Sequence, residues 1–446
     1  MKSFIAFSCF TCLLITYNDV QSQSSKKAQR PEPQGWYTGD MHVHRNCGTD
    51  SVTDVSQLKT MMEVNDLDVI SVLADMGNGE VKFSEKDLMN VNGKPAAESS
   101  DNRIVNWDVE WHWDATYSQF AKQALGGHLV LLGLNNAKQI WEESPYRILD
   151  WGKKQNAVSG FAHMEYLNDS VQTKLNCCIP IDYPVEAAMG TINFISEDVF
   201  GATSPNNGTY YNDGAIDAYY KLLNCGFRLA LVAGTDYPCN NYEPLGSLLT
   251  YVNVPEGKLT YQKWVEGIRQ GKTVVSRNSH HEFLDLSVND TKGPGDTILL
   301  DKTGGVNVSV TWSADQELSG TLEIVQNGKV IASLNDTLQT DSVAILAVNA
   351  SFFQSGWICA RRMSPTGHMV HTSAVYVSVK NKSVRASVAD ADYFISWINN
   401  IIASTKPGGD WNKYFPETYT SVSKRYAKAL GVYKKIRKEA VAAASR

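Results

Sequence analysis

Between residues 35 and 280, short apolar segments alternate with amphipathic or polar ones. The apolar segments are bounded by turn-forming residues, which predicts strands at Leu67–Leu73, His128–Leu134, Ser159–His163, Val185–Gly190, Phe227–Ala233, Leu248–Val254 and Thr273–Ser276. A helical spacing of apolar residues predicts helices at Gln57–Val64, Ala215–Leu223 and Tyr261–Arg269. Repeated strand–helix units favour an α/β fold with a closed barrel over an open sheet. The sequence has no Gly-x-Gly-x-x-Gly turn, which disfavours a dinucleotide-binding fold.

The pattern changes after His281, where apolar and polar residues alternate within segments separated by turns such as Asn327-Gly328. Such alternation predicts antiparallel strands with one buried face. We expect these strands at Phe283–Val288, Val306–Trp312, Gly320–Gln326, Val330–Leu334, Ser342–Val348, Gly356–Arg361 and Ala374–Val379. Their number and spacing predict an antiparallel β-sandwich of about a hundred residues.

A third pattern begins near Ala386, where apolar residues recur at helical spacing. They form two stripes separated by Pro407-Gly408-Gly409, which predicts two helices: Tyr393, Phe394, Trp397, Ile398, Ile401 and Ile402, then Val422, Tyr426, Leu430, Tyr433 and Ile436. The second helix carries a basic outer face, which is either solvated or a contact for an acidic surface. We therefore expect four segments: a signal peptide (1–22), a barrel (30–280), a sandwich (281–382) and C-terminal helices (386–446).

The first 22 residues combine a charged start, a short apolar run and a small-residue cleavage site near Ser22, as in a secretory signal peptide. We expect export to the periplasm or the exterior, with lipid anchoring at Cys9 as an alternative. No other segment approaches the length of a transmembrane helix. A net charge of −6 offers no basic face for nucleic acid over the whole chain. Six cysteines remain after export, and the sequence does not give their pairing: Cys47, Cys177, Cys178, Cys225, Cys239 and Cys359.

The stretch Asp40-Met-His42-Val-His44 lies where a short strand gives way to a loop. Residues two apart in a strand point the same way, so both imidazoles can reach one ion. Asp40 lies on the same face, either as a third ligand or as a residue that orients a ligand. Paired histidines at this spacing also occur in strands that bind nothing.

Four more candidate ligands occur near strand ends: Glu110, His128, His163 and Asp236. In an α/β barrel, polar residues at the carboxyl ends of different strands meet at one mouth. Simpler alternatives exist, since His128 follows two glycines as a loop residue would and Asp236 could cap a turn. Imidazoles and carboxylates without thiolates predict a site for zinc, manganese or iron. A carboxylate such as Glu110 can bridge two ions that share a hydroxide.

These motifs resemble the PHP (polymerase and histidinol phosphatase) superfamily, and within it the CehA/McbA branch of carbaryl-hydrolase-like metallohydrolases. The resemblance rests on Gly39-Asp-Met-His-Val-His44, Leu73-Ala-Asp-Met76, Glu110, His128, His163 and Gly234-Thr-Asp-Tyr-Pro238 in this order. Similar stretches follow at Gly271-Lys-Thr-Val-Val-Ser-Arg-Asn278, Gly293-Pro-Gly-Asp296 and His371-Thr-Ser-Ala-Val-Tyr-Val377. The resemblance covers roughly residues 34 to 380. It implies a distorted β/α barrel that holds divalent metals and hydrolyses amide, carbamate, ester or phosphoester bonds.

The family pattern implies metal ligands at His42, His44, Glu110, His128, His163 and Asp236. Two histidines that the family often has are replaced here by Met76 and Pro238, and both belong to the site of a third ion in the superfamily. We therefore expect one or two ions. Our hypothesis for two ions assigns the ligands as follows: His42, His44, Glu110 and Asp236 hold one, and Glu110, His128 and His163 hold the other.

Residues beside these motifs are candidates for the chemistry itself. Asp75 could be a ligand or carry a proton to the leaving group, or it could cap the turn at Gly77. His112, two residues from Glu110, could act as a general acid near neutral pH or only support its neighbours. Arg45 could act on an anionic group of the substrate or lie solvated at the surface.

Three residues are candidates for binding substrate: Arg277, Asn278 and Tyr237. A guanidinium such as that of Arg277 suits a carboxylate or phosphate, although surface solvation is its commoner fate. Trp107, Trp111 and Trp113 could line an apolar or sugar-binding mouth, or could pack against the sheet.

The expected function is that of an exported hydrolase in which a metal-bound hydroxide attacks an amide, carbamate or ester bond of a small-molecule or glycan-like substrate. One alternative is a phosphoesterase, which the superfamily and the two arginines suggest. Another is a non-catalytic secreted protein that binds glycans or surfaces and keeps a residual metal site. The sequence has no Gly-x-Ser-x-Gly turn, which disfavours a serine hydrolase.

Overall fold

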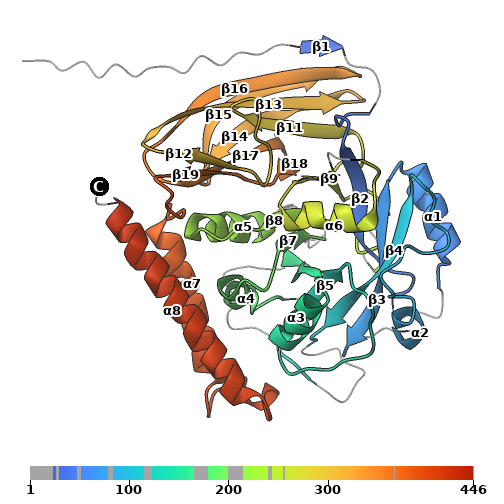
Figure 1. Ribbon diagram of the computed structural model, residues 1–446, viewed down its shortest axis with the longest axis vertical. Helices are drawn as coiled ribbons and strands as arrows, with labels where there is room; N and C mark the ends of the chain where they lie inside the picture. Colours follow the sequence, from blue (N-terminus) through green and yellow to red (C-terminus); the bar gives the residue numbers. More distant parts are fainter. Residues whose placement is uncertain are drawn as a thin grey trace, which may run out of the picture.

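The computed structural model describes residues 24–26, 30–47, 52–78, 84–114, 123–164, 179–198, 214–239, 244–254, 257–365 and 367–444. The expected signal peptide and the Cys177–Cys178 pair lie outside these ranges. The described chain is a mixed α/β fold in which a β-rich region lies against an α/β region, with a helical hairpin along one side (Figure 1).

Nine strands of one sheet form the α/β region. They are β2 (Trp36–Val43), β3 (Val69–Gly77), β4 (Ile104–His112), β5 (His128–Leu132), β6 (Val158–Phe161), β7 (Phe194–Glu197), β8 (Ala230–Ala233), β9 (Leu249–Asn253) and β10 (Thr273–Ser276). Their hydrogen-bonded order is β10-β9-β2-β3-β4-β5-β6-β7-β8. The helices between them are α1 (Val55–Val64), α2 (Ser84–Leu88), α3 (Pro145–Lys154), α4 (Tyr183–Met189), α5 (Gly214–Cys225) and α6 (Tyr261–Arg269). Every residue of β3 and β4 is buried, as in strands covered on both faces.

The sheet is mixed, not wholly parallel. β5 runs antiparallel to both β4 and β6, and β9 runs antiparallel to β2. The last strand, β8, reaches β9 and β10 through side chains: Thr250 Oγ1 bonds the backbone N and O of Ala233 at 2.7 and 2.8 Å, and Thr273 Oγ1 donates to Leu231 O at 2.7 Å. Within the described strands no backbone ladder joins β8 to β9 or β10. The closed barrel expected from the sequence is therefore not confirmed. Side chains, and not backbone pairing, connect β8 to β9 and β10.

Val185–Gly190, expected as a strand, instead lies in helix α4 and its cap, so that prediction is wrong. Pro184 sits in the first turn of the helix, where proline is tolerated, and Gly190 ends it with a left-handed φ of 64°. A short apolar run alone does not separate a strand from a buried helix. The expected helices near α1, α5 and α6 are confirmed, and α6 begins after Thr260, whose side chain accepts from Lys263 N.

Residues 282–379 form the expected alternating strands in two layers (Figure 1). One layer contains β11 (Glu282–Val288), β13 (Gly304–Ala314) and β16 (Ser342–Phe352), flanked by β1 (Ser24–Lys26). The other contains β12 (Thr297–Leu300), β14 (Leu318–Gln326), β15 (Lys329–Leu338), β17 (Gly356–Ser364), β18 (Gly367–Thr372) and β19 (Val375–Val379). Alternate residues of β13 are buried between them, from Val306 to Trp312. This arrangement agrees with the predicted sandwich.

The two regions share a sheet. Strand β18 pairs antiparallel with β10, with His371 opposite Val275. The hydrogen-bonded path therefore runs without a break from β12 in the sandwich to β8 in the α/β region. The expected boundary between residues 280 and 281 marks a change of sequence pattern, but the strands on either side of it belong to one sheet.

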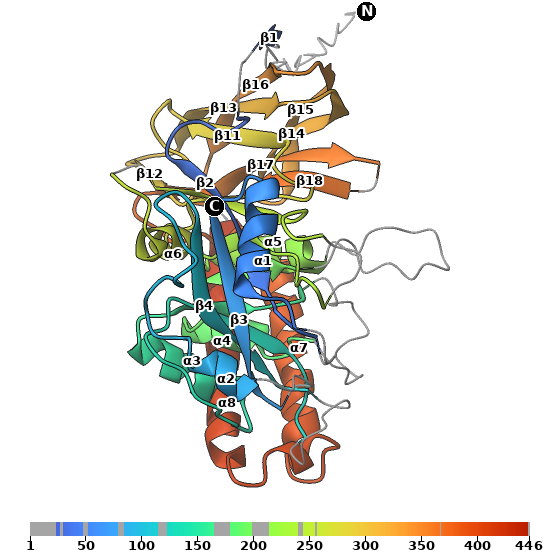
Figure 2. The ribbon, with the colours of Figure 1, turned by 90° about the vertical axis from the view of Figure 1, so that its right-hand side faces the viewer.

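The C-terminal segment forms helices α7 (Val388–Thr405) and α8 (Tyr419–Ala444), with a short 3-10 helix at Asn412–Tyr414 between them. Both expected apolar stripes are largely buried, and the hairpin packs on α4 (Figure 2). Trp397 Nε1 donates to Ile181 O at 2.9 Å, and Tyr433 OH donates to Pro184 O at 2.9 Å. No helix among the described residues is both long and apolar enough to cross a membrane.

Candidate metal centre

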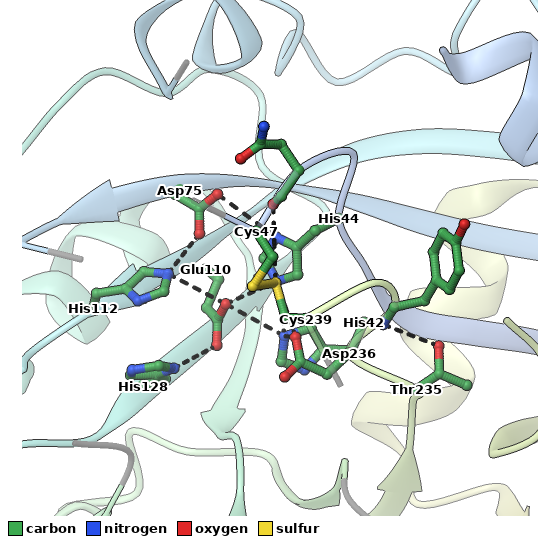
Figure 3. The surroundings of a disulfide bond; sticks show 12 residues. His42, His44, Cys47, Asp75, Glu110, His112, His128, Thr235, Asp236 and Cys239 are labelled. Atoms are coloured by element: carbon green, nitrogen blue, oxygen red, sulfur yellow. Dashed lines mark hydrogen bonds and ion pairs between the residues drawn. A yellow bond between two sulfur atoms is a disulfide. The ribbon is translucent and has the colours of Figure 1, made fainter. Parts of the chain in front are cut away.

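All six expected ligands gather at one end of the sheet, although they come from strands far apart in the sequence. Figure 3 shows five of them, His42, His44, Glu110, His128 and Asp236, and His163 lies 3.4 Å from Glu110. Most of them lie at or beyond the carboxyl end of a strand. His128 is the exception, since it begins β5. Because β5 is antiparallel to β4, His128 pairs with His112 at the last residue of β4 and so reaches the same end.

The first set of donor atoms surrounds Glu110 Oε2. His44 Nε2 lies 3.0 Å from this oxygen and His42 Nε2 lies 3.3 Å from it, with 3.2 Å between the two nitrogens. Asp236 Oδ1 lies 3.4 Å from both nitrogens. These four buried or nearly buried groups are close enough together to hold one ion.

A second set of donors surrounds Glu110 Oε1. His128 Nδ1 lies 2.9 Å and His163 Nε2 3.4 Å from this oxygen, and the two nitrogens are 3.2 Å apart. His112 also approaches the carboxylate, with Nε2 3.3 Å from Oε2, and Glu110, His112 and His128 form a further group that could hold a metal. Glu110 therefore presents one oxygen to each set, as a bridging carboxylate does.

Carboxylates stand behind the ring nitrogens that face away from Glu110. Asp198 Oδ1 lies 3.2 Å from His42 Nδ1, and Asp114 Oδ1 lies 2.9 Å from His128 Nε2. Asp75 Oδ2 lies 3.6 Å from His44 Nδ1. Metal-binding histidines are commonly oriented by a carboxylate on the second nitrogen, so the donor set fits a metal centre.

The buried imidazoles and carboxylates compensate one another's charge. Burial disfavours protonation of His44, but Asp75 and Glu110 outweigh it and raise the pKa of this imidazole to about 10. Burial and His112 disfavour protonation of His128, but Asp114 and Glu110 raise its pKa to about 9. Against the effect of its own burial, the surrounding imidazoles hold the pKa of Glu110 well below its usual range. A divalent cation would take the place of these protons.

Asp40 supports the centre from within the core. Its fully buried carboxylate accepts hydrogen bonds from Thr235 Oγ1 at 2.6 Å, Thr235 N at 3.0 Å, Gly246 N at 3.1 Å and His42 N at 3.2 Å. These contacts fit a residue that orients a ligand, because one of them reaches the backbone of His42. Gly234 leaves no room for a side chain, because a Cβ there would lie 2.6 Å from that of His42.

Two of the expected ligands have strained backbones. His163 and Asp236 adopt left-handed φ angles of 56° and 53°, which residues with a side chain rarely do. Such conformations cost about 1–3 kcal/mol each and cluster at functional sites.

A disulfide lies beside the centre (Figure 3). Cys47 and Cys239 are bonded, and they follow His44 and Asp236 in the chain. The bond therefore ties the loop after β2 to the loop after β8. The other two cysteines among the described residues, Cys225 and Cys359, are buried thiols.

The two candidate arginines lie outside the cluster. Arg45 Nη1 donates to Asp87 Oδ1 at 2.7 Å, and its guanidinium lies 5.7 Å from the centre of the Trp107 ring. Arg277 Nε donates to Glu197 Oε2 at 2.8 Å, and both of these side chains are fully buried. Arg277 is buried, whereas 19% of the Arg45 side chain is exposed, and both arginines pair with carboxylates outside the donor sets.

The remaining candidates divide between the centre and its surroundings. Asp75 and His112 belong to the centre, with Asp75 Oδ1 2.6 Å from His112 Nε2. Asn278 Nδ2 donates to Glu282 Oε1 at 2.8 Å, away from the donor sets. Tyr237 is half-buried, and its backbone oxygen accepts from His44 N at 2.5 Å. Trp107, Trp111 and Trp113 are buried, and the Trp111 ring lies near the rings of Trp113 and Trp141.

Two functional candidates were missed by the sequence reasoning, Asp114 and Asp198. Asp114 continues an alternation of ionisable residues that runs through Asp108, Glu110 and His112, and this period of two was a usable signal. Asp198 follows β7, a strand that the apolar pattern did not indicate.

Comparisons with known proteins add no family. No family model matches the chain, and no curated protein matches it. Among solved structures, a CARDB domain from Pyrococcus furiosus is 18% identical over 23% of this chain and 98% of its own, with a TM-score of 0.17. A crystal structure of that domain in complex with di-metal ions is 19% identical over 22% of this chain and 96% of its own, with a TM-score of 0.17. An engineered protein is 15% identical over 44% of each chain, with a TM-score of 0.14. Likeness at this level carries no conclusion about fold or function.

Proposed function

We propose that this chain is a metal-dependent hydrolase of the PHP type, close to the CehA/McbA branch, that holds two divalent ions and cleaves an amide, carbamate or ester bond. The observation that carries the proposal is the position of Glu110, whose two carboxylate oxygens each face a separate set of imidazole nitrogens. Carboxylates behind His42, His44 and His128 add the support that metal ligands need. Nitrogen and oxygen donors of this kind suit zinc, manganese or iron.

The bound ions would supply Lewis-acid polarisation of the substrate and an activated water. The chain's own residues would do the rest. Glu110 and Asp236 neutralise the charge of the ions, and the histidines fix their positions. His112 Nε2 lies 2.6 Å from Asp75 Oδ1, and this pair would carry the proton that the leaving group takes up.

The two alternatives have less support. A phosphoesterase would gain from free arginines near the ions, but Arg45 and Arg277 are paired with Asp87 and Glu197. A glycan-binding surface would gain from exposed aromatic rings, but the tryptophans from Trp107 to Trp113 are buried.

The test begins with metal analysis of the purified protein and of His163→Ala. The proposal expects two ions in the parent protein and one in the variant, since His163 belongs to only one donor set. His281→Ala is the matched control, because His281 lies outside the centre and pairs with Asp315. Three tightly held ions, or none, would contradict the proposal.

Activity is then tested with a panel of neutral esters, aryl carbamates and aryl phosphates on the metal-loaded protein. The proposal expects turnover of the esters or carbamates that His163→Ala loses and His281→Ala keeps. Turnover of phosphates alone would favour the phosphoesterase.

A further inference from the structure

A buried ion-pair triad joins the sandwich to the α/β region. Glu197 ends β7, and its carboxylate lies between Arg277, which follows β10, and His368 of β18. Arg277 Nε donates to Oε2 at 2.8 Å, and His368 Nε2 lies 2.9 and 3.0 Å from Oε1 and Oε2. The three side chains are at most 1% exposed.

Glu197 also has short connections to the metal centre. Its backbone oxygen accepts from Gly234 N at 3.0 Å, at the start of the loop that carries the aspartate ligand. The next residue, Asp198, lies 3.2 Å from His42 Nδ1 and accepts from His163 N at 2.7 Å. The end of β7 therefore contacts three of the segments that supply ligands.

Stability alone is a weak explanation for the triad. Removing charged groups from water costs desolvation free energy. Apolar residues of similar volume therefore often stabilise a protein core as much as a buried ion pair does. What an ion pair adds is direction, because a guanidinium and an imidazole hold a carboxylate at fixed angles. The triad fixes the end of β7, which contacts His42 of β2, His163 after β6 and Gly234 in the loop after β8.

We propose that Arg277 and His368 position the metal centre through Glu197. In this inference, which rests on the metal-dependent function proposed above, the triad sets the end of β7 and thereby the orientation of His42 and His163. The sandwich thus contributes to the geometry of the ion sites, since His368 belongs to it. Arg277, Glu197 and His368 are positioning residues, because their contacts join them to one another and, through the backbone of Glu197, to Gly234.

The test is Glu197→Gln, which removes the charge and keeps the shape. Glu282→Gln is the matched control, because Glu282 is also a fully buried glutamate that pairs with an arginine, Arg362 of the sandwich. Zn²⁺ affinity of the full chain is measured by chelator competition, ligand geometry by the visible absorption of bound Co²⁺, and stability by denaturant unfolding. We expect both variants to lose stability, but only Glu197→Gln to bind Zn²⁺ about tenfold more weakly and to shift the Co²⁺ bands.

Equal Zn²⁺ affinity and unchanged Co²⁺ bands in the two variants would overturn this inference and leave the proposed function standing. If Glu197→Gln does not fold, His368→Gln decides by the same comparison, because it leaves the pair of Arg277 and Glu197 in place. A parent protein that binds no metal would overturn the proposed function together with the inference, so the two failures are distinguishable.

Discussion

Metal binding at this centre should release protons, and the number released should depend on Asp75. Asp75 Oδ2 lies 3.6 Å from His44 Nδ1, and Asp75 Oδ1 lies 2.6 Å from His112 Nε2. Burial alone would lower the pKa of His44, but Asp75 and Glu110 raise it to about 10. At pH 7.5 the metal-free protein therefore carries a proton on His44 that an incoming ion must displace.

The magnitude follows from that pKa. Removing a proton from a group with a pKa of about 10 at pH 7.5 costs about 3 kcal/mol, or about 300-fold in affinity, relative to an imidazole that is already neutral. Metal affinity should rise about tenfold per pH unit for each proton released, up to the pKa of the group.

Calorimetry of Zn²⁺ binding in two buffers with different ionisation enthalpies counts the protons released. Asp75→Asn should release about one proton fewer than the parent protein. Asp315→Asn should release the parent number, because it removes a carboxylate that lies 3.1 Å from His281 Nδ1 outside the centre. Metal affinity that does not change with pH, or equal proton release by Asp75→Asn and the parent, would refute the reasoning.

Four further predictions concern stability. Gly160→Ala should destabilise the fold by about 1–3 kcal/mol in denaturant unfolding, because its Cβ would lie 2.3 Å from a buried phenylalanine ring. Gly431→Ala in α8, where no atom lies within 4 Å of the new Cβ, should instead stabilise it by about 1 kcal/mol. Burial lowers the pKa of His371 to about 3. Between pH 6.5 and 3, this imidazole is therefore protonated in the unfolded chain and neutral in the folded chain. The free energy of unfolding should therefore fall by about 1.4 kcal/mol for each pH unit between 6.5 and 3, and His371→Gln should lack this component when the two pH profiles are compared. Replacing Cys47 and Cys239 together by serine should lower the free energy of unfolding by about 5 kcal/mol, since their bond spans 192 residues. An equal melting temperature in the parent and the double variant would contradict this.

The sequence located the donor residues better than it described the sheet that carries them. The spacing of His42 and His44 and the strand-end position of His163 were readable because strands alternate their side chains and place polar ends together. The antiparallel direction of β5 was not readable, since a five-residue apolar run has no direction of its own. The prediction of a strand at Val185–Gly190 is wrong for a different reason, because only Pro184 and Gly190 distinguish its helix from a strand.

The residues that orient the ligands were harder to find than the ligands. Asp198 is one acidic residue among many in the sequence, and only the fold brings it to His42 across more than 150 positions. The sequence indicates Arg277 as a substrate-binding residue because guanidinium groups often bind carboxylates or phosphates. Its partner Glu197 lies 80 positions away, so nothing local indicated a buried pair.

The pairing of β10 with β18 has a consequence for dissecting the protein. A chain truncated after residue 280 would lack the neighbour of β10 and present open amide and carbonyl groups to other molecules, which invites aggregation. The two halves should therefore melt together, as one cooperative calorimetric transition, even though their sequences look like separate modules. A functional domain transfer, natural or engineered, should therefore include both the α/β region and the sandwich.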